Sequence, residues 1–149
     1  MESVRIGLVG LGTVGGSLYE LLTGNAAEIS RRLGVALEVP VEAVRDPSRP
    51  RAVRPGTRVV GGFREILDDP SLSVVVELVG GTGAAHEVVR GALERGRHVI
   101  TANKALLAAH GEDLFALARA KGVELLFEAS VCGGIPIVKA LRESLLGNR

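Results

Sequence analysis

The sequence has few aromatic residues, one cysteine and no tryptophan, and its charges almost cancel. Aromatic residues make up 3% of the 149 positions, whereas 46% of the positions are hydrophobic, so the core must be built mainly from aliphatic side chains. An aliphatic core combined with 20 glycines is typical of a parallel sheet covered by helices, because such strands are buried on both faces. The length fits one ordinary domain.

Each scarcity argues against a class of protein. Cys132 is the single cysteine, so an internal disulfide is excluded and a reducing cytoplasm is the expected location. The formal net charge of +1 offers no concentrated basic surface for nucleic acid or an anionic membrane. No run reaches the roughly 18 apolar residues of a membrane span, and the first residues lack a signal-peptide pattern. We therefore expect an intracellular α/β domain.

Hydrophobic periodicity predicts that strands and helices alternate along the chain. The expected strands cover residues 4–9, 37–44, 58–60, 73–79, 98–101 and 123–128. The expected helices cover residues 13–34, 63–67, 84–95, 106–121 and 136–146, and His110-Gly111 favours a break in the fourth. Such alternation forms βαβ units, which predicts a doubly wound, mostly parallel sheet of the Rossmann type with about six strands.

A glycine-rich turn joins the first expected strand to the first expected helix. It matches the pattern G-x-G-x-x-G with residues Gly10, Leu11, Gly12, Thr13, Val14 and Gly15. In this pattern the first glycine permits a tight turn, the second lets the backbone approach a diphosphate, and the third lets helix and strand pack closely. The free N–H groups at the helix N-terminus then bind the phosphates. The turn therefore predicts a dinucleotide-binding loop.

The end of the second expected strand bears on which dinucleotide is bound. An NAD site usually has an acidic residue there, which accepts hydrogen bonds from the ribose 2′-hydroxyl. Here the strand ends in Arg45 and Asp46, with Arg49 and Arg51 close behind. A guanidinium matches a 2′-phosphate in shape and charge, so NADP(H) is favoured. NAD(H) stays open, because Asp46 takes the acidic role if the strand extends one residue further.

Three further segments follow strands in the second half of the chain. They are ELVGG at residues 77–81, HVITANKALL at residues 98–107 and FEASVCGGIPI at residues 127–137. Together with the glycine loop, these segments in this order resemble homoserine dehydrogenase, and the resemblance covers almost the whole chain. The TANK and EASVxGGIP segments are more specific than the glycine loop. All three lie at carboxyl ends of strands, where an open α/β sheet binds its ligand.

The resemblance implies roles for several residues. Lys104 corresponds to a lysine that lines the active site and contacts cofactor or substrate, and a cation at a helix N-terminus is otherwise unfavourable. Gly81 and Thr82, with Gly80, are expected along the ribose and nicotinamide, because glycines allow close approach of the backbone. Asn103 is expected to cap the following helix.

The resemblance also implies a bound monovalent cation such as Na⁺, held by main-chain oxygens. Carried over by position, its ligands are Glu128, Val131, Gly133 and Ile135, and hard cations do prefer such carbonyl oxygens. A glycine-containing turn without an ion is an equally good interpretation of this segment.

The family also implies parts that residues 1–149 do not contain. Relatives continue, beyond a segment equivalent to residues 135–149, into a substrate domain that also forms a homodimer, and their reaction interconverts L-homoserine and L-aspartate 4-semialdehyde. We therefore expect the 149-residue chain to bind cofactor but to lack dehydrogenase activity by itself.

Two alternatives stay open from the residues alone. One is a sugar or inositol dehydrogenase of the same fold, although those carry Glu-Lys-Pro where this chain has Asn-Lys-Ala, and the other is a regulatory module that senses NAD(H).

Overall fold

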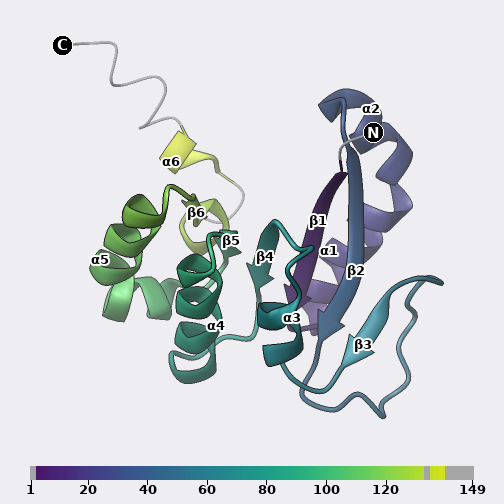
Figure 1. Ribbon diagram of the computed structural model, residues 1–149, viewed down its shortest axis with the longest axis horizontal. Helices are drawn as coiled ribbons and strands as arrows, with labels where there is room; N and C mark the ends of the chain where they lie inside the picture. The colour runs from purple at the N-terminus through teal and green to yellow at the C-terminus, as the bar shows by residue number, and fades with distance from the viewer. Residues whose placement is uncertain (1–2, 133–134, 140–149) are drawn as a thin grey trace.

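The computed structural model describes residues 3–132 and 135–139, which form one sheet with helices on both faces (Figure 1). The strands are β1 (Ser3–Val9), β2 (Ala36–Ala43), β3 (Arg58–Val60), β4 (Val74–Glu77), β5 (His98–Thr101) and β6 (Leu125–Leu126). The helices are α1 (Thr13–Gly24), α2 (Ala26–Leu33), α3 (Arg64–Asp68), α4 (Gly83–Glu94), α5 (Lys104–Lys121) and α6 (Ile137–Lys139). A 3₁₀ turn, η1 (Glu128–Ser130), follows β6.

The six strands are all parallel and lie in the order β3-β2-β1-β4-β5-β6. The predicted doubly wound sheet of Rossmann type is therefore confirmed. The chain adds β2 and β3 on one side of β1 and then returns to add β4, β5 and β6 on the other side. The strand order thus reverses between β1 and β4, and in such sheets ligands bind in the crevice outside the carboxyl ends at this point.

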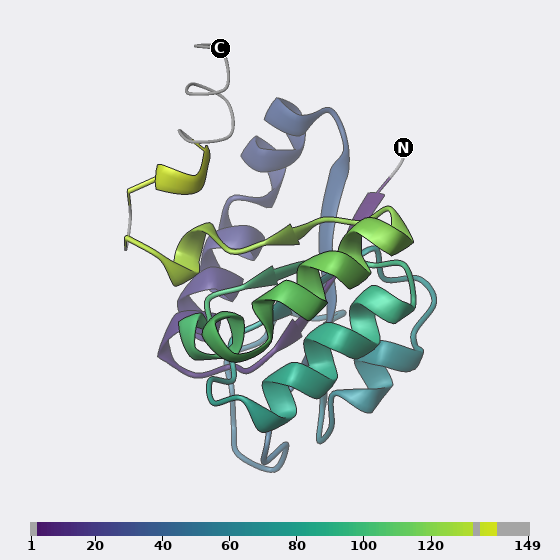
Figure 2. The ribbon, with the colours of Figure 1, turned by 90° about the vertical axis from the view of Figure 1, so that its left-hand side faces the viewer.

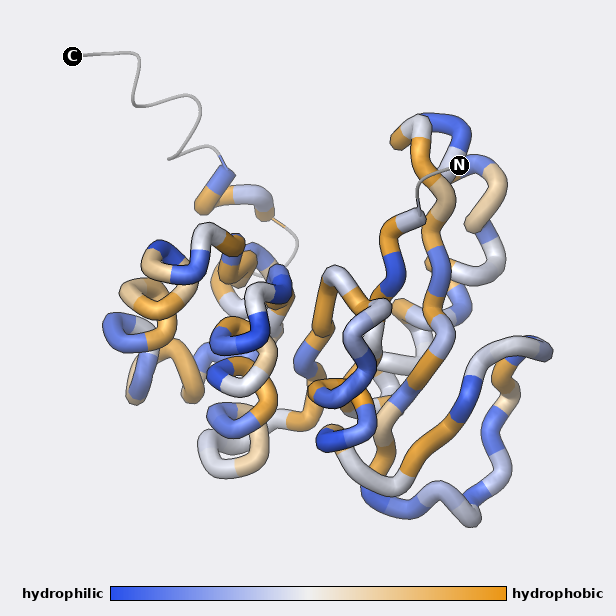
Figure 3. The backbone as a smooth tube through the Cα atoms, in the orientation of Figure 1, coloured by the Kyte–Doolittle hydropathy of each residue, from blue (hydrophilic) through white to orange (hydrophobic). Residues whose placement is uncertain are grey.

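Aliphatic side chains on the two faces of the sheet build two core clusters. One face packs against α1, with Tyr19 of that helix among the buried residues Ile6, Leu8, Val39 and Val76. The other face carries the larger cluster, which includes Val41, Val75 and Val99 of the strands and the inner sides of α3, α4 and α5. Figure 2 shows α4 and α5 lying side by side over this face, and hydrophobic colouring follows the strands in Figure 3.

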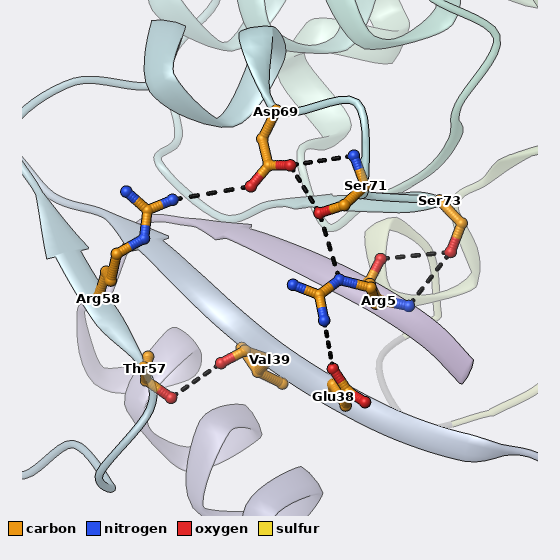
Figure 4. Close-up of polar contacts among 8 residues, drawn as sticks. All are labelled: Arg5, Glu38, Val39, Thr57, Arg58, Asp69, Ser71 and Ser73. Atoms are coloured by element: carbon orange, nitrogen blue, oxygen red, sulfur yellow. Dashed lines mark hydrogen bonds and ion pairs between the residues drawn. The ribbon is translucent and has the colours of Figure 1, made fainter. Parts of the chain in front are cut away.

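Polar contacts hold the amino edge of the sheet together. Arg5 at the start of β1 forms an ion pair with Glu38 of β2 and donates to the Ser71 hydroxyl (Figure 4). Asp69 accepts hydrogen bonds from the backbone and side chain of Ser71, and it also faces Arg58 of β3. These contacts tie β1 and β3 to the turn that precedes β4, on the side of the sheet away from the glycine loop.

The helix expected over residues 13–34 is in fact two helices, so this prediction was wrong. The chain changes direction at Asn25, whose φ of −110° and ψ of 17° end α1 and begin α2. Both the backbone N–H and the side-chain Nδ2 of Asn25 donate to the carbonyl of Leu21. An asparagine side chain competes in this way for backbone groups of the helix, and it follows Gly24, another weak helix former.

Two other differences concern the second half. The expected break at His110-Gly111 does not occur, because α5 runs unbroken from Lys104 to Lys121. Gly111 is buried on this helix, where it lies beside Leu107 and Phe115. The expected strand over residues 123–128 shrinks to Leu125–Leu126, and the chain then turns into η1. Of the helix expected over residues 136–146, the structure describes Ile137–Lys139, and residues 140–149 lie outside the described part.

None of the helices within residues 3–132 and 135–139 combines the length and the apolar character needed to cross a membrane.

Candidate functional site

The register of the sheet brings the predicted site residues to one edge. Val9 pairs with Ala43 on one side and with Glu77 on the other, and Glu77 pairs with Thr101. These four residues end β1, β2, β4 and β5, so the chain leaves all four strands at the same level. The glycine loop, Arg45, Gly81 with Thr82, and Lys104 follow directly. The structure therefore brings together segments that are far apart in the sequence.

The glycine loop has the geometry that its pattern predicts. Gly10 has a φ of 103°, a conformation that favours glycine, and its N–H donates to the carbonyl of Ala43 at 2.9 Å. A Cβ atom on Gly15 would lie 1.9 Å from the carbonyl oxygen of Gly10, so only glycine lets α1 pack so closely on the loop. Gly12 faces open space. The first and third glycines thus shape the turn, and the second leaves the backbone accessible.

The N-terminus of α1 is left free to bind an anion. Its N-cap residue is Gly12, and within this fully described helix neither a capping side chain nor an acidic residue of the first turn occupies the terminus. Helix N-termini carry partial positive charge and unpaired N–H groups. By contrast, α5 is capped by its own Asn103. The open, uncapped terminus beside a glycine loop fits the diphosphate of a dinucleotide.

The residues after β2 separate into a free arginine and a structured turn. Arg45 is exposed and makes no ion pair or hydrogen bond with the rest of the described chain. Asp46 instead accepts hydrogen bonds from the hydroxyl and the backbone N–H of Ser48, and these bonds hold the pKa of the Asp46 carboxyl below its usual range. Arg51 donates to the carbonyls of Asp46 and Arg49. Of these side chains, Arg45 is therefore free to bind a ligand.

Glu77 lies at the centre of a buried polar network. Its side chain is fully buried, and Oε1 accepts the backbone N–H of Val79 at 2.8 Å and of Gly80 at 3.3 Å. Its Oε2 accepts the hydroxyl of Thr101 at 2.6 Å. The Glu77 carboxyl group therefore accepts hydrogen bonds from both the loop after β4 and the end of β5.

Asn103 joins that loop to the start of α5. Its Oδ1 accepts the N–H of Leu106 at 3.0 Å, which confirms the predicted N-cap. Its Nδ2 donates to the carbonyl of Gly81 at 2.6 Å, and its backbone N–H donates to the Thr101 hydroxyl. One side chain thus fixes the relative positions of the two loops, and with them the start of the helix that carries Lys104.

A cleft of about 330 Å³ opens between these loops and the start of α1. Its walls are formed by Val14, Glu77, Leu78, Gly80, Ala102, Asn103, Lys104 and Ala105. Lys104 is exposed and begins α5, as the sequence predicts for a lysine beside the ligand. Val14 in the first turn of α1 and Lys104 therefore border one cleft at the point where the strand order reverses.

The predicted cation ligands are only partly described. Glu128, Val131 and Ile135 lie in and after η1, whereas Gly133 lies outside the described residues. The carboxylate of Glu128 accepts the backbone N–H groups of Val138 and Lys139, so it caps the start of α6. The main-chain cation site stays a prediction.

Sequence reasoning missed two residues of the network and one buried carboxyl elsewhere. Thr101 bridges Glu77 and Asn103, and the Ser130 hydroxyl donates to the Thr101 carbonyl at 2.8 Å. A polar residue at the carboxyl end of a buried strand was the available signal for Thr101, whereas Ser130 lies in η1, after β6. Glu42 is fully buried in β2, with no hydrogen-bond partner for either carboxyl oxygen in the described structure. Burial raises the pKa of the Glu42 carboxyl to about 7, which the charge of Arg51 partly offsets.

The fold, the glycine loop and the cleft at the strand reversal define a dinucleotide-binding domain of the Rossmann type. A family model described as "Homoserine dehydrogenase, NAD binding domain" matches residues 10–128. The whole chain is 49% identical to a homoserine dehydrogenase of Pseudomonas aeruginosa and 48% identical to one of Neisseria gonorrhoeae, and it covers 34% of each. This chain therefore belongs to the homoserine dehydrogenase family, in which it corresponds to the NAD-binding domain.

Solved structures agree with this assignment. The chain superposes over its full length on 35% of a homoserine dehydrogenase from Thiobacillus denitrificans, with a TM-score of 0.91 and 48% identity. It also resembles a hyperthermophilic archaeal homoserine dehydrogenase in complex with NADPH, with a TM-score of 0.77 and 28% identity over 97% of this chain and 50% of that one. The chain spans about a third of the length of the curated relatives named above.

Proposed function

We propose that this chain binds NADP(H) and supplies the cofactor half of a homoserine dehydrogenase. The complete enzyme interconverts L-homoserine and L-aspartate 4-semialdehyde, a step toward threonine, methionine and isoleucine. The observation that carries the proposal is the shared cleft, which is bordered by the uncapped N-terminus of α1 and by Lys104. An archaeal relative has been solved with NADPH, which supports a phosphorylated cofactor.

Arg45 is the residue that favours NADP(H) over NAD(H) in this proposal. It is exposed, lies two residues beyond the end of β2, and makes no ion pair or hydrogen bond within the described chain that would compete with a ligand. Asp46 is the residue that would serve NAD(H), but its carboxylate is engaged by Ser48. A guanidinium binds a phosphate with paired, charge-assisted hydrogen bonds. The free cation and the engaged carboxylate therefore favour the 2′-phosphate.

Lys104 is the chain's own contribution to proton transfer. When bound, the nicotinamide supplies the hydride acceptor or donor. The Lys104 ammonium projects from the start of α5 beside the cleft, where Nζ can donate to the oxygen of the substrate and hold a proton there. A lysine at this helix position opposes the helix dipole, so function explains its placement better than stability does. Asn103 keeps it in place through its contact with Gly81.

The test is a titration of the 149-residue protein with NADPH and with NADH, followed by calorimetry or by cofactor fluorescence. Arg45→Ala should weaken NADPH about 10- to 100-fold, the effect of losing roughly 1.5–3 kcal/mol of charge-assisted hydrogen bonding, and should leave NADH almost unchanged. Arg119→Ala is the matched control, because Arg119 is an exposed arginine in the last turn of α5, at the opposite edge of the sheet. Equal losses for both cofactors would remove Arg45 from the proposal. No binding by the unaltered protein would refute the proposed function itself.

A further inference from the structure

The hydrogen bonds of Glu77 do not by themselves require a charged side chain. Three donors satisfy this carboxylate, and two of them are the backbone N–H groups of Val79 and Gly80 in the cleft wall. An amide side chain or a water molecule could support the same loop without a net charge. Burying an ionised carboxylate is costly even when it is hydrogen-bonded, so its position beside the cleft calls for a reason beyond the support of a loop.

The cleft contains one charge of each sign. Of the lining residues that the structure describes, only Glu77 and Lys104 are ionisable, and the remaining six are uncharged. Lys104 is exposed, whereas Glu77 is fully buried. Water screens the charge of an exposed group much more effectively than that of a buried one. Water therefore screens the carboxylate of Glu77 less than the ammonium of Lys104, and the electric field of the carboxylate acts more strongly on a ligand in the cleft.

The two oxidation states of a nicotinamide differ by one charge on the ring. The oxidised ring is a cation, and the reduced ring is neutral. We propose that the buried carboxylate of Glu77 makes this cleft discriminate between them, by binding the oxidised cofactor more tightly than an uncharged cleft would. Lys104, which lines the same cleft, opposes this effect, so the pair sets the balance between NADP⁺ and NADPH. This inference rests on the proposed function, because it requires the nicotinamide to lie in this cleft.

The proposal makes Glu77 a residue that sets cofactor specificity by charge. A purely structural carboxylate would affect both forms of the cofactor alike, because loss of the loop geometry does not depend on the charge of the ligand. The ratio of the two dissociation constants, Kd for NADPH over Kd for NADP⁺, separates the two roles. This ratio needs only binding measurements and no turnover.

Glu77→Gln keeps the shape of the side chain and removes its charge. We expect NADP⁺ binding to weaken about tenfold more than NADPH binding, as measured by fluorescence titration with NADPH and by competition with NADP⁺. Glu77→Asp keeps the charge and should preserve the wild-type ratio within about twofold, even if both affinities fall. Glu42→Gln is the matched control, because Glu42 is an equally buried carboxyl of the same sheet. Glu42 pairs with Leu8, two strands away from the cleft wall.

Lys104→Met keeps the proposal testable if Glu77→Gln does not fold, because Lys104 is exposed. Among the lining residues that the structure describes, Glu77 is then the only ionisable one, and the ratio of Kd for NADPH over Kd for NADP⁺ should rise above that of the unaltered protein. A fall of this ratio in Lys104→Met would overturn the proposal, as would equal weakening of both cofactors in Glu77→Gln. Failure of the unaltered chain to bind either cofactor would refute the proposed function as well. Binding of both cofactors with a ratio that Glu77→Gln leaves unchanged would refute this inference alone.

Discussion

Replacing Asn103 with alanine should destabilise the domain, because this side chain is hydrogen-bonded to two segments that border the cleft. The variant loses the cap on α5, because Oδ1 no longer accepts the Leu106 N–H, and such caps contribute about 1 kcal/mol. It also loses the 2.6 Å hydrogen bond to the Gly81 carbonyl, a buried contact that contributes roughly 1–1.5 kcal/mol. The two losses together predict a decrease of about 2–2.5 kcal/mol in the free energy of unfolding.

Urea denaturation of the 149-residue protein, followed by far-UV circular dichroism, measures this decrease. Thermal unfolding should show a Tm lower by about 5–10 °C, since about 1 kcal/mol shifts the Tm of a domain of this size by about 2–4 °C. Asn103→Ser separates the two contributions, because serine is a good N-cap but is too short to reach Gly81. It should therefore recover about 1 kcal/mol. A decrease below about 0.5 kcal/mol in Asn103→Ala, or identical stabilities of the serine and alanine variants, would refute this account of the network.

The remaining predictions concern catalysis, pH and the separate chain. In an enzyme that joins this chain to a substrate domain, Lys104→Ala should lower kcat/KM for homoserine by about 10²-fold without changing the circular dichroism spectrum; near-normal turnover would return Lys104 to the role of a surface lysine. Because burial raises the pKa of Glu42 to about 7 when folded, the contribution of this group to stability should be greatest below its unfolded pKa of about 4.3 and should fall by roughly 2–3 kcal/mol as the pH rises to 7. Glu42→Gln should remove this dependence, and an unchanged profile would assign it to other groups. The 149-residue chain should bind NADPH yet form none of it from homoserine and NADP⁺ at a useful rate, and robust turnover would contradict the division of labour proposed for the complete enzyme.

The cofactor loop could be predicted closely because all its determinants are consecutive. A short aliphatic strand, three glycines at defined spacing and an amphipathic helix occupy residues 4–24, and each glycine's role follows from local geometry. The N-cap at Asn103 was predictable for the same reason, since capping involves a residue and the N–H three positions later. The boundary at Asn25 was missed although it is also local, because an apolar helical period continues across it and outweighed the turn signal of Gly24 and Asn25.

The polar network could not be predicted, because its members meet only across the sheet. Glu77 and Thr101 are 24 positions apart, and they touch because β4 and β5 pair in the register that aligns them. The sequence showed only that a glutamate in a buried strand needs a partner. Glu42 also lies in a buried strand, yet its carboxyl oxygens have no hydrogen-bond partner in the described residues. Which buried carboxyl finds donors depends on the loops that fold over each strand end.

The sequence by itself determined the class of fold, the position of the cofactor loop, the candidate residues Arg45 and Lys104, and the family. These depend on periodicity, turn chemistry and segment order, which are properties of neighbouring residues. Only the tertiary structure decided that Glu77 accepts a hydrogen bond from Thr101 of the neighbouring strand, that Asn103 reaches the carbonyl of Gly81, and that Glu77 and Lys104 border one cleft. These depend on strand register and on helix packing, which bring distant residues within a few ångströms of each other and decide which polar groups keep their water.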